Sequence, residues 1–138
     1  MMTTASPPPG QGWYAATPFR AEPEPIAPGV CLIRLSGDLD IDTSDIASEA
    51  VRANVAPPAR IVVLDLSGVT FCSSSGLRVL VAAAREAAAH GIELRLAGAG
   101  RPVRRPMQVT SLDIQFLSFS SVAAALAHGT TSAGREAD

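Results

Sequence analysis

The stretch Arg60-Ile61-Val62-Val63-Leu64-Asp65-Leu66 decides the fold class of this 138-residue chain. Its apolar residues follow one another almost without a break, which is typical of a strand buried on both faces in the centre of a sheet. From Leu77 to about Ala89 the chain is rich in Ala, Leu and Val, which predicts a helix ended by His90-Gly91. A buried strand followed by a helix predicts an α/β fold.

Strands and helices alternate along the rest of the chain. The runs 30–35, 92–96 and 114–117 predict further strands, and the alternation in 92–96 places Ile92, Leu94 and Leu96 inward. Helices are expected at 44–55 behind Thr43 or Ser44 as N-cap, in a short segment starting near Pro102, and at 122–127 behind Ser120 or Ser121. These spacings predict a largely parallel sheet.

The N-terminal part has a different composition. Residues 1–28 hold seven of the eleven prolines, and proline is excluded from central strands and helix interiors. We therefore expect a disordered tail at 1–28, in which 13–26 has room for an irregular edge strand because edges tolerate proline. The folded domain is expected at 29–128, with order beginning at Val30, and a second disordered tail at 129–138.

Composition excludes several classes of function. With 47% hydrophobic and 17% charged residues, the chain supports one ordinary domain. A net charge of -2 argues against a nucleic-acid partner. Cys31 and Cys72 are too few for a disulfide scaffold and match no metal-ligand spacing. Because neither a secretory signal nor a membrane span is apparent, we expect a cytoplasmic protein without membrane partner, metal or cofactor.

The turn Cys72-Ser73-Ser74-Ser75-Gly76 carries the functional signal. It opens a helix, where free N–H groups and the positive end of the helix dipole tolerate a phosphate. For a partner packed on the same spot, that phosphate is an added charge of nearly two units. A penalty of about 3 kcal/mol lowers affinity more than 100-fold, enough for a switch. Alternatively, Ser74 or Ser75 is simply an N-cap; the two interpretations are compatible.

Three stretches together resemble the anti-sigma factor antagonists, which are STAS domains of bacterial sigma-factor control. Residues 35–40 resemble the opening L-x-G-E/D-L-D, residues 63–71 resemble V-L-D-L-S-x-V-x-F, and residues 74–77 match the phosphoacceptor turn S-S-G-L. The match covers about residues 28–127. It implies a small, mostly parallel or mixed sheet with helices packed mainly on one side.

The resemblance also implies a mechanism without catalysis by this chain. The unphosphorylated protein is expected to bind an anti-sigma factor and so free a sigma factor. That anti-sigma factor is an ATP-dependent serine kinase that phosphorylates and inactivates its antagonist, and a serine phosphatase reverses this. The acceptor falls on Ser74, with Ser73 and Ser75 as rivals. The implied partner-binding residues are Asp38, Asp40, Ser73, Ser75 and Gly76.

The chain departs from the family pattern at three places. Ser73 stands where the family usually has aspartate, which removes a carboxylate beside the acceptor. Pro106 is expected to interrupt the third helix, and Thr110-Ser111-Leu112 replaces the usual T-G-L. A second hypothesis is therefore a constitutive STAS scaffold or transporter subunit, in which Ser73 marks a lost switch.

Other residue patterns have ordinary explanations beside the functional ones. Asp38, Asp40 and Asp42 alternate like metal ligands but lack a closing glutamate, so solvated turn residues are favoured. A hydrolase requires a base near its serine, yet the elbow pattern G-x-S-x-G is absent, and His90 and His128 lie far along the chain.

Cys72 beside the helix opening is either a redox sensor or a small buried core residue, and burial is favoured. The cluster Arg101, Arg104 and Arg105 is read as a solvated helix face that is also able to contact an acidic partner.

Overall fold

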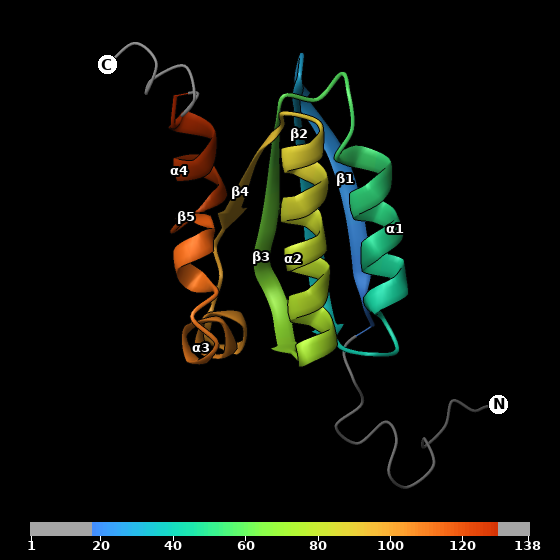
Figure 1. Cartoon of the computed structure of the whole chain (residues 1–138), viewed down its shortest axis with the longest axis vertical. Coiled ribbons are helices and arrows are strands. Elements are labelled where there is room, and N and C mark those ends of the chain that lie inside the picture. Colours follow the sequence, from blue (N-terminus) through green and yellow to red (C-terminus); the bar gives the residue numbers. More distant parts are fainter. Residues whose placement is uncertain (1–17, 130–138) are drawn as a thin grey trace, which may run out of the picture.

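The computed structural model describes residues 18–129, which form a five-stranded mixed sheet and four α-helices (Figure 1). The strand order follows the sequence. The first pair is antiparallel, and each later pair is parallel. The strands are β1 (Arg20–Ala27), β2 (Val30–Leu39), β3 (Ile61–Cys72), β4 (Glu93–Ala97) and β5 (Leu117–Phe119). The predicted α/β class is confirmed.

The helices cover both faces of the sheet unequally. The main core contains residues of three helices, whereas the fourth packs on the opposite face through Ala125. Neighbouring strand residues alternate between these cores: Ile33 and Leu64 face the main core, and Leu32 and Val63 the smaller one. This confirms the prediction that the helices pack mainly on one side of the sheet. They are α1 (Ser44–Asn54), α2 (Ser74–Ala89), α3 (Arg101–Val109) and α4 (Val122–Ala127).

The central strand behaves as its composition predicts. Val62, Val63 and Leu64 of β3 are fully buried, because helices pack against both faces at this point. The strand continues beyond the predicted apolar run to Cys72, so it leads directly into the serine turn. None of the helices within residues 18–129 has the length and apolar content needed to cross a membrane.

The folded structure begins earlier in the chain than Val30, the starting point expected from the proline content. Strand β1 pairs with β2 from Arg20 onward and contains Pro23 and Pro25. In a strand, the backbone N–H groups of residues two apart face the same edge. The N–H groups that Pro23 and Pro25 lack are therefore both missing from one edge of β1. An edge strand tolerates this arrangement, because its outer edge has no ladder to complete. Of the range 13–26, residues up to 17 lie outside the described part.

Arg95 departs from the expected pattern of β4. It lies on the face opposite Leu96 and is only 1% exposed, because α4 covers that face of the sheet. Its Nε donates to Glu93 Oε2 at 2.7 Å. The guanidinium also donates to backbone carbonyls near the end of α4, where intrahelical partners are missing. These are the oxygens of Ala125 (2.6 Å), His128 (3.0 Å) and Gly129 (2.8 Å).

The C-terminal third corrects two further expectations. Pro106 does not interrupt the third helix: α3 includes it and ends three residues later at Val109. The lost N–H affects one bond near the end of a short helix, so the cost stays local. The last strand, predicted at 114–117, is β5 and follows a 3₁₀ turn at Asp113–Gln115. Ser121 caps α4 as predicted, since its Oγ accepts from Ala124 N at 3.0 Å.

Candidate functional site at the serine turn

The ends of β2 and β3 form the base of the site. Two register shifts each give β3 one extra residue relative to β2, so that Asp38 faces Phe71. Bulges of this kind re-aim side chains and are frequent beside functional sites. Thr70 is thereby brought next to Asp38, and its Oγ1 donates to Asp38 Oδ1 at 2.6 Å.

The loop between β2 and α1 is held by its own side chains. Thr43 Oγ1 donates to the Asp38 carbonyl at 2.7 Å and accepts from Asp40 N at 2.9 Å. Asp40 Oδ1 accepts from the backbone N–H groups of Asp42 (2.9 Å) and Thr43 (3.2 Å). Thr43 occupies the N-cap position of α1 as predicted, but its hydroxyl caps no helical N–H, because these loop bonds engage it.

The serine turn connects this loop to α2. Ser73 N donates to the Leu39 carbonyl at 3.0 Å, which fixes the start of the turn beside β2. Ser73 is also the N-cap, and its Oγ accepts from Gly76 N at 3.4 Å. The sequence interpretation that Ser74 or Ser75 is the cap is therefore wrong. Ser74 is the first residue inside α2.

The residues of the turn differ in their access to solvent. The Ser74 residue is exposed, whereas Ser73 and Ser75 are half-buried. Gly76 is buried, so its place in the site is one of packing rather than of outward contact. Asp38 and Asp40 are half-buried beside the turn. The structure thus brings the predicted residues together and makes Ser74 the most exposed of the three serines in the turn.

Cys72 forms the buried floor behind the serines. Cys72 is only 7% exposed, and this burial raises the pKa of its thiol from the usual 9.0 to about 11. A thiol with so high a pKa is almost entirely protonated at neutral pH and is a poor nucleophile. The favoured interpretation of Cys72 as a small core residue is confirmed.

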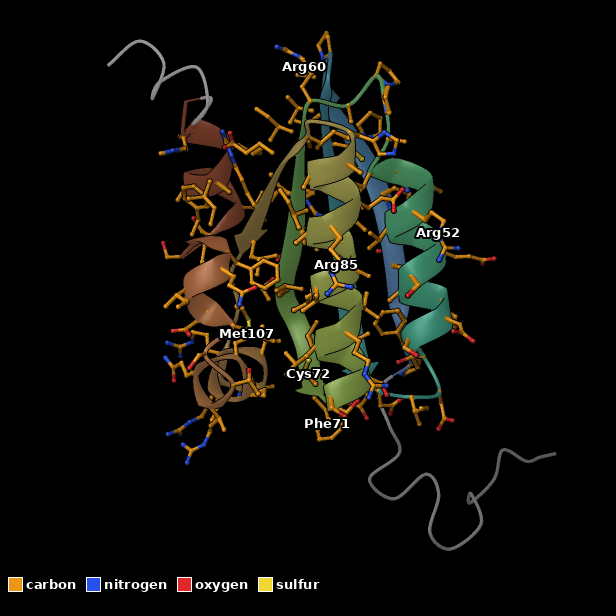
Figure 2. All side chains as sticks on the ribbon, in the orientation of Figure 1. Arg52, Arg60, Phe71, Cys72, Arg85 and Met107 are labelled. Carbon is orange, nitrogen blue, oxygen red and sulfur yellow. The ribbon has the colours of Figure 1, made fainter. Side chains whose placement is uncertain are left out.

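An open groove of about 730 Å³ runs from the serine turn to α3. Phe71, which is 51% exposed, lies on it at the end of the molecule where α2 begins (Figure 2). The sequence around Phe71 gave no sign that this residue is exposed, because an apolar residue in a predicted strand is expected to lie in the core. The groove is lined by Thr70, Phe71, Cys72, Ser74, Leu77, Arg101, Pro102, Arg105, Pro106, Val109 and Thr110.

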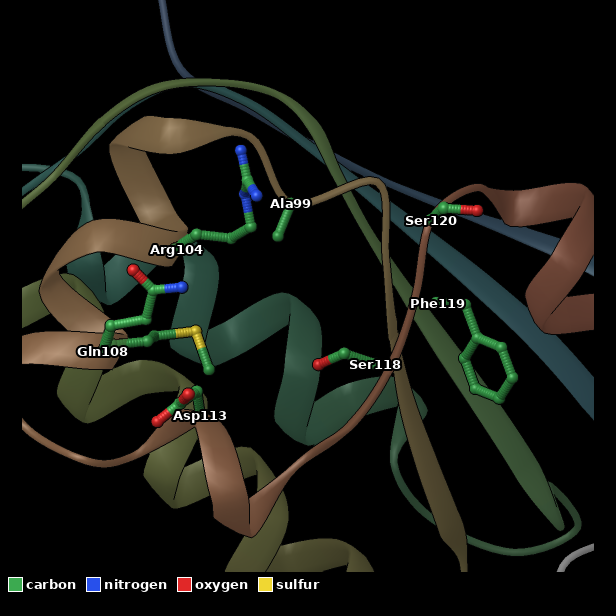
Figure 3. Close-up of a pocket in the computed structure, with 8 residues that line it drawn as sticks. Ala99, Arg104, Gln108, Asp113, Ser118, Phe119 and Ser120 are labelled. Carbon is green, nitrogen blue, oxygen red and sulfur yellow. The ribbon is translucent and has the colours of Figure 1, made fainter.

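The arginine cluster divides between two sides of α3. Arg101 and Arg105 line this groove, whereas Arg104 lines a different pocket of about 530 Å³ with Gln108 and Ser118 (Figure 3). All three arginines are exposed. The cluster is thus a solvated helix face, as the sequence indicated, and two of its members share a cavity with Ser74.

Neither histidine lies near the serine turn. His90 follows the last residue of α2, and this helix of 16 residues is about 24 Å long. The His90 side chain pairs with Glu86 at 3.4 Å. The His128 ring packs against Phe119, with 5.0 Å between centroids. Among residues 18–129, no three His, Cys, Asp or Glu side chains gather as metal ligands do.

Comparison with known proteins identifies the family. A STAS domain family model matches residues 24–125. The anti-sigma-F factor antagonist RsfB from Mycobacterium tuberculosis is 34% identical over 98 residues, which are 71% of this chain and 80% of RsfB.

Solved structures agree with this match. The crystal structure of an anti-sigma factor antagonist from Mycobacterium paratuberculosis has a TM-score of 0.72 at 29% identity, over 79% of this chain and 92% of that one. The Bacillus cell fate determinant SpoIIAA in its phosphorylated form shares the fold, with a TM-score of 0.58 at 16% identity, over 86% of this chain and 100% of that one.

Proposed function

Because this chain belongs to the STAS domain family, among its anti-sigma factor antagonists, we propose that it binds an anti-sigma factor through the serine turn and so frees a sigma factor. The observation that carries the proposal is the exposed Ser74 at the start of α2, beside the half-exposed Phe71. An exposed aromatic ring next to a polar turn is a common anchor for a protein partner.

Phosphorylation of Ser74 is the proposed off-switch. The kinase transfers the γ-phosphoryl group of ATP to Ser74 Oγ: a new P–O bond forms, the bond to ADP breaks, and the hydroxyl loses its proton. The positive end of α2 favours the added negative charge within this chain. At the interface the same charge must be desolvated beside Phe71, which opposes binding. SpoIIAA, which shares the fold, exists in a phosphorylated form, and this supports the compatibility of the fold with a phosphate.

The proposed partners are an anti-sigma factor that is also an ATP-binding serine kinase, and a serine phosphatase that restores the free hydroxyl. We place this cycle in the bacterial cytoplasm, where sigma factors act. The proposed contact surface contains Phe71, Ser74 and the neighbouring Ser75, with Asp38 and Asp40 at its border. Gly76 contributes by letting α2 approach Leu39 rather than by touching the partner.

The test uses the purified protein, its candidate anti-sigma factor kinase and Mg-ATP, with the phosphate located by mass spectrometry. Phosphate is expected on Ser74, and Ser74→Ala should prevent its incorporation. The single variants Ser73→Ala and Ser75→Ala show whether either of these serines takes up phosphate in place of Ser74. Incorporation that persists at Ser73 or Ser75 in the Ser74→Ala protein would move the switch to that residue.

Binding by calorimetry completes the test. Ser74→Ala should bind the anti-sigma factor like the parent, and phosphorylation should weaken binding about 100-fold. Ser74→Asp adds a single charge, so a loss of about tenfold is expected. Ser120→Asp adds the same charge at an exposed serine away from the turn and should leave affinity unchanged. Equal affinity of all five proteins, the phosphorylated one included, would rule out the switch.

A constitutive scaffold is the second candidate, and Ser73 favours it. Where the family usually has a carboxylate, this chain has a hydroxyl that is engaged as the cap of α2. On this hypothesis, the protein binds its partner with full affinity and takes up no phosphate at residues 73–75. The two measurements above separate the candidates.

A further inference from the structure

We propose that Arg101 and Arg105 of α3 form a binding site for the phosphate carried by Ser74, so that phosphorylation links α2 to α3 across the groove. The inference rests on the proposed function, because it assigns the groups that receive the modification. Figure 1 shows α3 at the same end of the molecule as the start of α2. The three side chains that the inference joins all line one groove.

The two arginines are placed to act together. They are four residues apart on α3, and residues at this spacing lie on the same face of a helix. Both are exposed, and neither forms an ion pair within residues 18–129. Helix α3 itself contains no acidic residue, so no carboxylate on the same helix competes for them. Within the described part of the chain they are therefore cations without an anionic partner.

The chemistry of the groove favours a phosphate over a weaker anion. A guanidinium presents its N–H donors in a planar fork that matches two phosphate oxygens, and such charge-assisted bonds are about twice as strong as neutral ones. Apolar side chains line the same groove, among them Phe71, Leu77, Pro102 and Val109.

Other charged groups near Ser74 also act on a phosphate there, and their contribution must be distinguished from that of Arg101 and Arg105. Arg78 lies four residues after Ser74 on α2 and is exposed, so it is a third cation within reach. Asp38 opposes the phosphate from β2, although its carboxylate already accepts from Thr70. An experiment therefore has to resolve the contributions of α2 and α3.

The experiment measures the second pKa of the phosphate by ³¹P NMR titration, with phosphoserine installed at position 74 during translation. Nearby cations favour the dianion and lower this pKa. Replacing both groove arginines (Arg101→Gln with Arg105→Gln) should raise it by about half a unit. The matched control is Arg104→Gln, which removes the same charge from the same helix but faces the other pocket, and it should change the pKa far less (Figure 3).

Thermal unfolding gives a second, independent readout. Phosphorylation should raise the midpoint in the parent and in Arg104→Gln, and this gain should shrink in the double variant. Because the substituted side chains are exposed, the unphosphorylated variants should unfold like the parent. A phosphate pKa that responds to Arg78→Gln but not to the double variant would overturn the inference.

The inference and the proposed function fail in different ways. Phosphoserine incorporated during translation requires no kinase, so the ³¹P measurement remains valid if the proposed partner is wrong. If the phosphorylated protein binds the anti-sigma factor as tightly as the free protein, the proposed switch fails while the arginine site stands. If the double variant leaves both readouts unchanged, the arginine site fails while the switch stands.

Discussion

Gly76 of α2 lies directly against Leu39 at the end of β2. A Cβ atom on Gly76 would lie 2.8 Å from both Cγ and the carbonyl oxygen of Leu39, and 2.9 Å from Cys72 Sγ. The carbonyl is backbone that also accepts from Ser73 N, so it cannot move without disturbing the turn. The absence of a side chain at Gly76 therefore sets how closely the serine turn approaches the sheet.

Gly76→Ala is expected to shift the start of α2 away from β2. Because three contacts under 3.0 Å must be relieved at once, we expect the free energy of unfolding to fall by about 1–3 kcal/mol. Denaturant titration measures this loss. The control is Gly129→Ala, where an added Cβ meets no atom within 4 Å. Equal stability of the two variants would show that the close approach is not maintained in solution.

Arg95→Met is expected to release α4 from the sheet. The substitution leaves the Glu93 carboxylate without this ion pair and three backbone carbonyls without their donor, at a cost of about 3–5 kcal/mol. Arg34→Met is the matched control, because its pair with Glu24 at 3.5 Å is half-exposed and is worth about 0–1 kcal/mol. Hydrogen exchange should show lost protection in α4 for Arg95→Met alone. Unchanged protection there would contradict the assigned role.

Ser111→Gly is expected to stabilise the protein. Ser111 has a φ of 61°, in the left-handed region that glycine adopts without a steric penalty. The gain is offset partly by the greater freedom of glycine in the unfolded chain, so a net increase of about 0.5–1 kcal/mol is expected. Thermal and denaturant unfolding both measure it. A decrease would mean that the serine side chain stabilises this turn more than the strain costs.

Cys72 is expected to resist alkylation in the folded protein. With its pKa raised to about 11, its thiolate fraction at pH 8 is about a hundredfold lower than that of a thiol with a pKa of 9.0. Mass spectrometry after iodoacetamide treatment should find Cys72 labelled only when the protein unfolds. Fast labelling at pH 8 in the native state would contradict the burial of this side chain.

The same thiol gives a pH dependence of stability. As pH rises from 9.0 towards 11, the unfolded cysteine loses its proton before the folded one does. The unfolded state then binds fewer protons than the native state, so the free energy of unfolding falls with pH in this window. Cys72→Ala should show a shallower fall than the parent. Identical slopes would exclude Cys72 as the titrating group.

Sequence alone was sufficient for the elements with strong local patterns. The apolar run of β3, the alanine-rich α2 and the serine cap of α4 all lie where the pattern placed them, because local propensity and tertiary packing agree there. The order of motifs around Leu39 and Ser74 also indicated the family. The resemblance named the serine turn, and the structure added which of its hydroxyls is exposed.

The remaining features depend on contacts between distant residues. Alternation in β4 gave no sign that Arg95 is buried, because that requires knowing that α4 covers the second face. Phe71 is exposed because register shifts between β2 and β3 re-aim the strand end, and a shift of this kind has no mark in the sequence. The prolines of β1 predicted a disordered tail with at most an irregular edge strand at 13–26, because the sequence alone does not show which strand edge they face.

Those prolines have a consequence for how copies of the protein meet. An exposed strand edge is a template on which another chain can add a strand, and this is a route to aggregation. Pro23 and Pro25 remove two donors from the same side of β1, so a foreign strand has no continuous ladder to complete there. At the opposite edge, β5 is only three residues long. Both margins of the sheet are thus poor templates, which favours recognition through side chains at the serine end over backbone pairing.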